Sequence, residues 1–258
     1  MKDIVVLKCG GSTIDTLSEQ FFTNIASLKK AGLNLIVVHG GGPAIKEMLT
    51  TLNVDTVFVD GLRKTTAPIM DVVEQVLAGK VNNALTAKLN YAGISSVGLS
   101  GSDAKLMTAK AKNFKRYGYV GEITDVNAAF LLQLIGIGIT PVIAPIAIGE
   151  NGVRYNINAD TAAGAVAKAI GAEKLIFVTD VPGVMQDDKL LDFITDADSE
   201  QLIADGVIHG GMIPKVRAAV ESLHDNLPEV MIVDGNQPKL TQNTGLVGTV
   251  IKKSIGVV

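Results

Sequence analysis

The chain has 258 residues, of which 47% are hydrophobic and 19% charged, a composition that suits a buried core and argues against disorder. Its 23 basic and 26 acidic residues give a net charge of −3, and no local cluster of Lys and Arg offsets it, so nucleic acid and anionic lipid are disfavoured as partners. Aromatic residues make up 4% and Trp is absent, which also disfavours a base-stacking surface.

The cysteine content and the start of the chain indicate a compartment. Cys9 is the only cysteine, so a disulfide within the chain is impossible and a reducing environment fits. The first residues enter an apolar run directly, without the regions of a signal peptide. The longest apolar stretches, such as residues 135–148, contain Gly and Pro and fall short of a membrane span. We therefore expect a cytoplasmic protein.

Strand and helix patterns alternate along the first part of the chain. Short apolar runs predict strands, and apolar residues at helical spacing predict helices, with Gly32 as a C-cap and Pro43 opening the second helix. The expected order is a strand at 4–7, a helix at 17–31, a strand at 35–38, a helix from residue 43, a hairpin arm at 54–59, a helix at 67–91 and a strand at 96–99.

The alternation continues to the end of the chain. The expected order is a hairpin within 107–126, a helix at 126–135, a strand at 140–144, a helix at 159–170, a strand at 174–179, helices at 198–205 and 212–223, and strands at 229–233 and 248–251. Such a pattern predicts an α/β fold with a mainly parallel sheet covered by helices on both faces. Sites in such folds lie beyond the carboxyl ends of the strands.

Two glycine-rich turns each follow an apolar strand directly. The sequence Lys-Cys-Gly-Gly occupies residues 8–11, and His-Gly-Gly-Gly occupies residues 39–42. Consecutive glycines let the backbone approach a ligand and aim several N–H groups at one anion. Lys8 could simply reach solvent from its strand end, but beside the glycines it favours a phosphate. The second turn, followed by Pro43, predicts an anion site rather than a plain tight turn.

Polar residues further along the chain form a candidate acceptor side. Arg63 lies in a basic segment, 61–66, which alone would be a solvated loop, but its planar guanidinium suits a carboxylate. Asn156, Asn158 and Asp160 stand at alternate positions where a helix begins. One of them is expected to cap that helix. We expect the two amides to bind a polar ligand and the carboxylate to hold ammonium groups.

Two segments extend the pattern into the C-terminal part. A glycine pair at 210–211 precedes a helix whose first turn holds Lys215, where the helix dipole disfavours a cation. A residue in such an unfavourable position often has a functional reason. Residues 179–184 again follow a buried strand and fit either a simple turn or a ligand loop.

Several familiar site motifs are missing from the sequence. There is no G-x-x-x-x-G-K-[ST] motif and no G-x-G-x-x-G after the first strand. An esterase is disfavoured because the nearest match to its G-x-S-x-G elbow, at 98–102, fails at the last position. Cys9 has no obvious base partner, which disfavours a nucleophilic role. Metal-ligand spacing is lacking in the histidines, which are His39, His209 and His224.

Taken together, these motifs resemble those of the amino acid kinase family. The matching segments follow the family's order and spacing over nearly the whole chain, and they are residues 8–11, 39–42, 61–63, 156–160, 179–183 and 210–215. The resemblance implies a three-layer α/β/α sandwich around an open sheet, built as a single domain over residues 1–258. It further implies an N-terminal lobe, about 1–171, for acceptor binding and dimerisation, and an ATP-binding C-terminal lobe, about 172–258.

The resemblance also implies roles for the candidate residues. Lys8 and Lys215 would stabilise the migrating phosphoryl group from two sides, and Asp160 would organise both lysines. Backbone donors would come from the glycine turns, namely Gly10, Gly11, Gly41 and Gly42. The acceptor would be bound by Gly41, Gly42, Arg63, Asn156 and Asn158, with the arginine on a carboxylate. The nucleotide would be flanked by Asp180, Val181, Pro182, Gly183, Val184, Met185, Val207, Ile208 and His209.

Within the family, the motifs are most similar to those of members that phosphorylate the side-chain carboxylate of N-acetyl-L-glutamate with ATP, in arginine biosynthesis. That carboxylate, with a pKa near ~4, is already ionised and needs no general base, and Mg²⁺ would arrive with the nucleotide. Two alternatives stay open. One is a kinase for an N-blocked or carrier-linked aminoadipate, and the other is a non-catalytic sensor of ATP or an amino acid.

The expected partners are N-acetyl-L-glutamate, ATP and a second copy of the chain, without nucleic acid, membrane or a metal held by the protein. Family members that arginine inhibits carry an additional N-terminal helix that builds a hexamer. Seven residues precede Lys8 here. We therefore expect a homodimer with weak or no inhibition by arginine.

Overall fold

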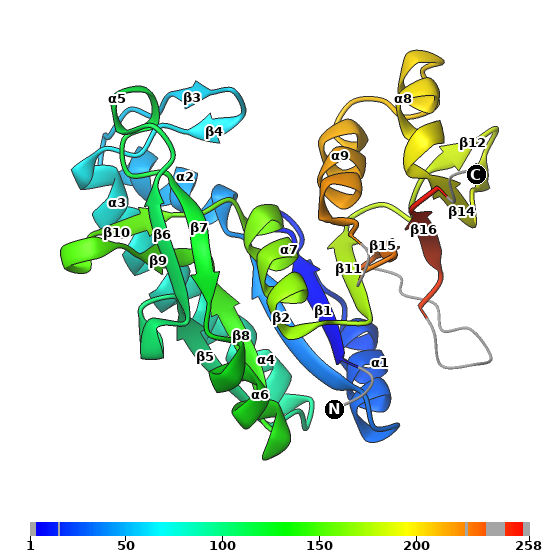
Figure 1. The fold of residues 1–258 in the computed structure, drawn as a ribbon, viewed down its shortest axis with the longest axis horizontal. Helices are drawn as coiled ribbons and strands as arrows, with labels where there is room; N and C mark the ends of the chain where they lie inside the picture. The colour runs from blue at the N-terminus through cyan, green and yellow to red at the C-terminus, as the bar shows by residue number, and fades with distance from the viewer. Residues whose placement is uncertain (1–3, 15, 225–226, 236–245, 255–258) are drawn as a thin grey trace.

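The computed structural model describes residues 4–14, 16–224, 227–235 and 246–254. Its largest element is an open eight-stranded sheet in the order β14-β16-β15-β11-β1-β2-β8-β5 (Figure 1). The strands are β1 (Ile4–Cys9), β2 (Asn34–His39), β5 (Ser96–Ser100), β8 (Thr140–Ala144), β11 (Lys174–Thr179), β14 (Phe193–Thr195), β15 (Glu229–Asp234) and β16 (Gly248–Lys252). Over these residues all neighbours pair in parallel except β15 and β16. The predicted class, with a mainly parallel open sheet, is confirmed.

Helices cover both faces of this sheet, which confirms the three-layer sandwich. One face packs against α1 (Glu19–Lys30), α2 (Gly42–Thr51), α3 (Ala67–Glu74) and α4 (Asn82–Tyr91). The other packs against α6 (Ala128–Gly136), α7 (Ala159–Ile170), α8 (Asp196–Ala204) and α9 (Met212–Ser222). In β1, Val5 and Leu7 enter the first core, and Ile4 and Val6 enter the second. Successive strand residues point to opposite faces, so a strand buried on both faces is apolar throughout.

Smaller sheets complete the chain. A four-stranded sheet contains β6 (Met107–Ala111), β7 (Gly121–Val126), β9 (Ile146–Ile148) and β10 (Arg154–Asn156), and the connection between β6 and β7 holds α5 (Phe114–Tyr117). Two hairpins pair β3 (Phe58–Val59) with β4 (Leu62–Arg63), and β12 (Met185–Gln186) with β13 (Lys189–Leu190). The hairpin predicted within 107–126 is confirmed as β6 and β7. Strands of two or three residues escape prediction because they show no periodicity.

Some predicted boundaries change for identifiable reasons. The arm predicted at 54–59 is paired only at Phe58–Val59, and the turn that follows has positive φ at Asp60 (49°) and Gly61 (76°), as tight hairpins require. The helix predicted from residue 198 begins at Asp196, because Thr195 and Asp198 form a capping box.

The long helix predicted over 67–91 contains a break in its hydrogen-bonding pattern. Between α3 and α4 the chain forms a π-helix, η1 (Gln75–Val81), whose N–H groups bond five residues back. The segment stays continuous, so the prediction holds for its length and differs in its winding. Such wide turns are frequent at functional sites. Here Leu77 and Val81 of η1 pack against Gly41 of the second glycine-rich turn.

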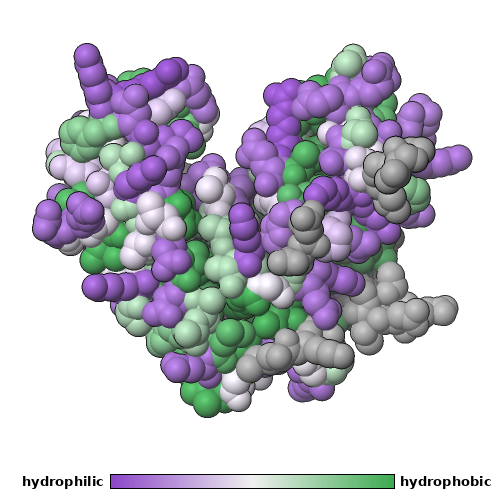
Figure 2. All heavy atoms as spheres, in the orientation of Figure 1, coloured by the Kyte–Doolittle hydropathy of each residue, from purple (hydrophilic) through white to green (hydrophobic). Residues whose placement is uncertain are grey.

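The molecule is hollowed at the carboxyl edge of the sheet. Figure 2 shows a notch at the top of the molecule, between the upper parts of two lobes. In Figure 1 one side of this notch carries α5 and the β3–β4 hairpin, and the other carries α8 and α9. Among the described residues, the helices are too short or too polar to span a membrane.

Candidate active site

The glycine-rich turns meet where β1 and β2 end. These strands are parallel neighbours, so both turns emerge at the same edge of the sheet. Gly40 donates its N–H to Cys9 O (2.9 Å), and Gly10 donates to Val178 O at the end of β11 (3.2 Å). A Cβ on Gly11 would come within 2.8 Å of the nitrogen of Gly42. Only glycine allows this approach of two backbones.

The second turn leads directly into helix α2. Gly41 is its N-cap, Pro43 lies in its first turn, and no side chain in the described part of the chain caps it. The first N–H groups of a helix have no partner within the helix. Together with the helix dipole, such N–H groups favour an anion, which is the prediction made for this turn.

Lys8 is held beside these turns by an ion pair that is only partly exposed to solvent. Its Nζ lies 2.7 Å from Asp160 Oδ1, and the two side chains are 14% and 30% exposed. Asp160 stands in the first turn of α7, where Asn158 is the N-cap and accepts from the N–H groups of Asp160 (2.8 Å) and Thr161 (3.1 Å). Capping of α7 therefore fixes the carboxylate that orients Lys8. The three alternating polar residues include the cap that the sequence required.

Lys215 stands in the first turn of α9, and its side chain reaches the carboxyl end of β11, the other neighbour of β1. Its Nζ donates to Thr179 Oγ1 and to Asp180 Oδ1, the latter at 3.0 Å. The bond from Lys215 lowers the pKa of the Asp180 carboxyl, and the Thr179 hydroxyl adds to the effect. We expected Asp160 to organise both lysines, but in the structure it forms an ion pair with Lys8. Lys215 instead forms its ion pair with Asp180, which directly follows β11.

The side chain of Arg63 is buried and packs against the second glycine turn. Its Nη2 donates to Gly42 O (3.1 Å), and its guanidinium lies 4.8 Å from the ring centre of Phe58. Its Nη1 is buried and has no hydrogen-bond partner among the described residues. Burial lowers the pKa of Arg63. A buried donor without a partner is costly, and a ligand carboxylate would supply the partner that this site lacks.

A threonine that the sequence analysis did not identify connects two of the predicted acceptor residues. Asn156 donates its amide N–H to Thr65 Oγ1 (3.1 Å), and Thr65 donates to Arg63 O (2.8 Å). Thr65 is fully buried. Its neighbours in the sequence are polar, so no local pattern marks it as part of the site.

The residues predicted beside the nucleotide differ in their exposure. Val184 and Ile208 are buried in the second hydrophobic core, so their side chains do not line an open site. Val184 instead donates its backbone N–H to Thr249 Oγ1 (2.8 Å). The same hydroxyl leaves no room for a Cβ atom on Gly183. Partly or fully exposed positions are Asp180, Val181, Pro182, Met185, Val207 and His209.

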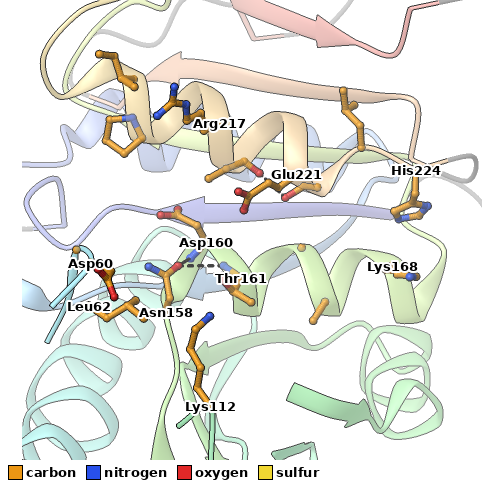
Figure 3. Close-up of a pocket in the computed structure, with 18 residues that line it drawn as sticks. Asp60, Leu62, Lys112, Asn158, Asp160, Thr161, Lys168, Arg217, Glu221 and His224 are labelled. Atoms are coloured by element: carbon orange, nitrogen blue, oxygen red, sulfur yellow. Dashed lines mark hydrogen bonds between the residues drawn. The ribbon is translucent and has the colours of Figure 1, made fainter. Parts of the chain in front are cut away.

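A cavity of about 840 Å³ opens along α7 and α9 and reaches the start of α7. Figure 3 shows Asn158, Asp160 and Thr161 at one end of this cavity and Lys168 with His224 at the other. Its lining also includes Asp60 and Gly61 of the β3–β4 turn and the helix residues next to Lys215, Ile213 and Pro214. Of the predicted site residues, Asn158 and Asp160 line this cavity, whereas the residues predicted beside the nucleotide do not.

Two buried titratable groups lie among the predicted motifs. Burial raises the pKa of the Cys9 thiol to about 12, so Cys9 stays protonated, in agreement with the absence of a nucleophilic role. Burial lowers the pKa of His39 from 6.5 to about 4, so the imidazole is neutral. His39 Nδ1 lies 2.8 Å from Gly40 O, and its Nε2 lies 3.0 Å from Asn82 Nδ2. No motif in the sequence marked Asn82, which lies in the predicted long helix.

The fold, the lysine side chains at the ends of β1 and β11 and the glycine turns are together typical of α/β proteins that bind phosphate groups. The model of the amino acid kinase family matches residues 3–234, and this chain belongs to that family. The chain is 51% identical to an acetylglutamate kinase of Halalkalibacterium halodurans, over 99% of this chain and 98% of that protein.

Solved structures agree with this assignment. The structure of smu.665 from Streptococcus mutans UA159 is 34% identical and superposes with a TM-score of 0.86, covering 98% of this chain and 99% of that one. A carbamate kinase from Giardia lamblia bound to AMP-PNP shares the fold at 18% identity, with a TM-score of 0.70 over 98% of this chain and 99% of its own.

Proposed function

We propose that this chain transfers the γ-phosphoryl group of ATP to the side-chain carboxylate of N-acetyl-L-glutamate, a step of arginine biosynthesis. The observation that carries the proposal is that the side chains of Lys8, in β1, and Lys215, in α9, lie at the carboxyl ends of the adjacent strands β1 and β11, where two glycine turns abut. The relative at 51% identity, which covers nearly the same length, is named acetylglutamate kinase.

The reaction needs charge stabilisation more than acid–base chemistry. An oxygen of the acceptor carboxylate forms a bond to the γ-phosphorus, while the bond to the bridging oxygen breaks and ADP leaves with that electron pair. Lys8 and Lys215 would neutralise the equatorial oxygens, and N–H groups of Gly11, Gly41 and Gly42 would donate to them. The acceptor carboxylate is already ionised at neutral pH, so the reaction needs no general base.

The acceptor would lie between Arg63 and the start of α7. The unpartnered Nη1 of Arg63 supports an ion pair with the α-carboxylate of the substrate. Asn156 and Asn158 lie on the same side, at the end of β10 and at the start of α7. Gly41 and Gly42 would border the acetylated end of the substrate.

ATP would bind over the C-terminal lobe, residues 172–258, with the acceptor in the N-terminal lobe, residues 1–171. Exposed residues in the segments 180–185 and 207–209, which follow β11 and α8, support this division. Mg²⁺ would enter bound to the phosphates, which supply the oxygen ligands it prefers. In the described part of the chain, no group of three or more His, Cys, Asp and Glu side chains could hold a metal ion.

We also propose that two copies of the chain form a dimer through the edge of the large sheet. β5 is the last strand at that edge, so its outer backbone groups have no neighbour within the sheet. Tyr91 at the end of α4 and Ile137 at the end of α6 are 98% and 72% exposed. Light scattering on the purified protein should give the mass of a dimer, and a monomer at micromolar concentration would contradict this proposal.

An ATP-dependent hydroxamate assay tests the proposed reaction. Purified protein is compared on N-acetylglutamate, glutamate, aspartate and N-acetyl-aminoadipate. We expect N-acetylglutamate to be the best acceptor in kcat/KM. A higher kcat/KM on the aminoadipate derivative would identify the alternative acceptor, and no turnover on any of them would leave a sensor of the same fold.

A further inference from the structure

We infer that His39 and Asn82 form a positioning pair that fixes the direction of the Gly41 N–H group in the second glycine turn. The inference rests on the proposed function, because it assigns that N–H to the phosphoryl group. Neither side chain touches the substrates in this scheme. Both are buried, at 0% and 2% exposure, so water does not compete for their hydrogen bonds.

The contacts define the protonation state of His39. Asn82 Nδ2 lies 2.9 Å from the carbonyl oxygen of Val142, so this atom is the NH₂ group of the amide. The same NH₂ lies 3.0 Å from His39 Nε2, which must therefore accept. A neutral imidazole then carries its proton on Nδ1, and Nδ1–H donates to Gly40 O at 2.8 Å.

Hydrogen bonds anchor three consecutive peptide units in this turn. Gly40 N–H donates to Cys9 O (2.9 Å) and fixes the unit between residues 39 and 40. Ile45 N–H donates to Gly41 O (3.0 Å) and fixes the unit between residues 41 and 42. The unit between Gly40 and Gly41 is anchored by His39. Because a peptide unit is planar and trans, its C=O and N–H point in opposite directions. Holding Gly40 O therefore aims Gly41 N–H.

Glycine makes this anchor necessary. A peptide unit between two glycines has more accessible orientations than any other, because neither residue carries a Cβ. Without a fixed partner for Gly40 O, the unit could rotate and turn Gly41 N–H away from the anion. Stabilisation by preorganised donors requires that the donors keep their direction before the substrate arrives.

The π-helix explains how Asn82 reaches His39. Leu77 and Val81 of η1 press on Gly41 from one side, and Asn82 follows directly at the start of α4. In an α-helix, residues five apart differ by about 140° around the axis. The i→i+5 bonding of η1 brings Leu77 and Asn82 to nearly the same side. The π-helix thus contacts the glycine turn in two ways. Leu77 packs against Gly41, and Asn82 holds His39, which in turn bonds to Gly40 O.

Two substitutions of His39 separate the hydrogen bonds. The Nδ2 of an asparagine occupies nearly the place of histidine Nδ1, so His39→Asn keeps a donor for Gly40 O. The terminal amide of a glutamine reaches the place of Nε2, so His39→Gln keeps the contact to Asn82 and loses the donor to Gly40 O. We expect His39→Gln to lower kcat about tenfold or more, and His39→Asn to stay within about threefold of the wild type.

Controls separate positioning from folding. Thr140→Val removes a buried hydroxyl from the first residue of β8, at the end of the strand away from the glycine turns, and should leave kcat unchanged. The melting temperature is measured for all three variants. A merely structural role would lower the melting temperature of both His39 variants and leave kcat of the folded protein unchanged. Equal losses of kcat in His39→Asn and His39→Gln would also overturn the inference.

The protonated nitrogen of His39 can be observed without any variant or any activity. Nitrogen-15 NMR of the histidine ring at pH 7 should show the Nδ1–H form. In Asn82→Leu, which removes the donor to Nε2, we expect a mixture of tautomers and a loss of kcat similar to that of His39→Gln. An Nε2–H tautomer in the wild type would refute the pair. Failure of the proposed function would instead appear as lack of turnover in the hydroxamate assay, with the tautomer unaffected.

Discussion

The side chains of Lys8, from β1, and Lys215, from α9, both lie at the carboxyl ends of adjacent strands, but their surroundings differ. Lys8 is 14% exposed, and its partner Asp160 is fixed by the capped start of α7. Lys215 is 34% exposed, and its partner Asp180 is 53% exposed. The first lysine is held in place by buried structure, and the second by a solvent-exposed carboxylate.

The same difference extends to the halves of the site. On the proposed acceptor side, the side chains of Arg63, Thr65 and His39 are buried, and each bonds to a backbone carbonyl group. On the nucleotide side, the described segments around Asp180 and His209 are largely exposed. The comparison suggests that the acceptor half is formed in advance, and that Lys215 exchanges Asp180 for phosphate oxygens when ATP binds.

The largest expected effect is the loss of either lysine. Lys8→Ala and Lys215→Ala should each lower kcat about a hundred- to a thousandfold, because each removes a positive charge from the developing phosphoryl charge, with smaller changes in KM. Steady-state kinetics with both substrates provide the measurement. Lys80→Ala is the matched control, since Lys80 forms an exposed ion pair with Glu47 at 3.3 Å. Intact turnover with a large loss of binding would contradict the phosphoryl role.

The buried half should also make stability depend on pH. The pKa of His39 falls from 6.5 to about 4 on folding, so the folded state disfavours its protonation. As the pH falls from 6.5, the unfolded chain gains this proton first and stability decreases, until the folded pKa is passed near 4. The loss attributable to His39 should be on the order of 3 kcal/mol. Urea unfolding of the wild type and of His39→Asn between pH 7 and 4 measures it. Parallel curves for the two proteins would show that His39 is not the cause.

Removal of the arginine should affect binding more than turnover. Arg63→Ala should raise the acceptor KM about tenfold, because a bond to a charged group contributes about 1.5–3 kcal/mol. Arg63→Lys should restore little, since an ammonium cannot reproduce the bond to Gly42 together with one to a carboxylate. An unchanged acceptor KM in initial-rate kinetics would remove Arg63 from the acceptor site.

The exposed half should show the smallest effect. Asp180→Asn should destabilise the protein by less than ~1 kcal/mol, because solvent screens an ion pair this exposed. The pKa of Asp180 is lowered in the folded state, so its contribution is present above the ordinary value near ~4 and is lost as the pH falls through the lower folded value. Thermal melting at pH 7 and pH 3 gives both quantities. A larger loss at pH 7 would mean that Lys215 is as firmly fixed as Lys8.

Most of the fold could be predicted because its local signals agree. Buried strands such as β1 and β11 are apolar runs followed directly by Gly or Asp, and Pro43 lies in the first turn of α2. Lys8 stands out because it ends such a run, Lys215 because it lies in the first turn of a helix after a glycine pair, and Arg63 because its guanidinium suits a carboxylate. Thr65 and Thr249 could not be identified in this way, since their hydroxyls bond to residues distant in the sequence.

The sequence by itself determined the alternation of strands and helices, the two places where backbone must approach backbone, and the candidate cations Lys8, Arg63 and Lys215. These are local properties, because glycine, proline and hydrophobic period act on their own segment. Only the tertiary structure decided which carboxylate pairs with Lys215 and that Asn82 supports His39. Those contacts depend on strand order and on the winding of η1, and neither is encoded in any short stretch of residues.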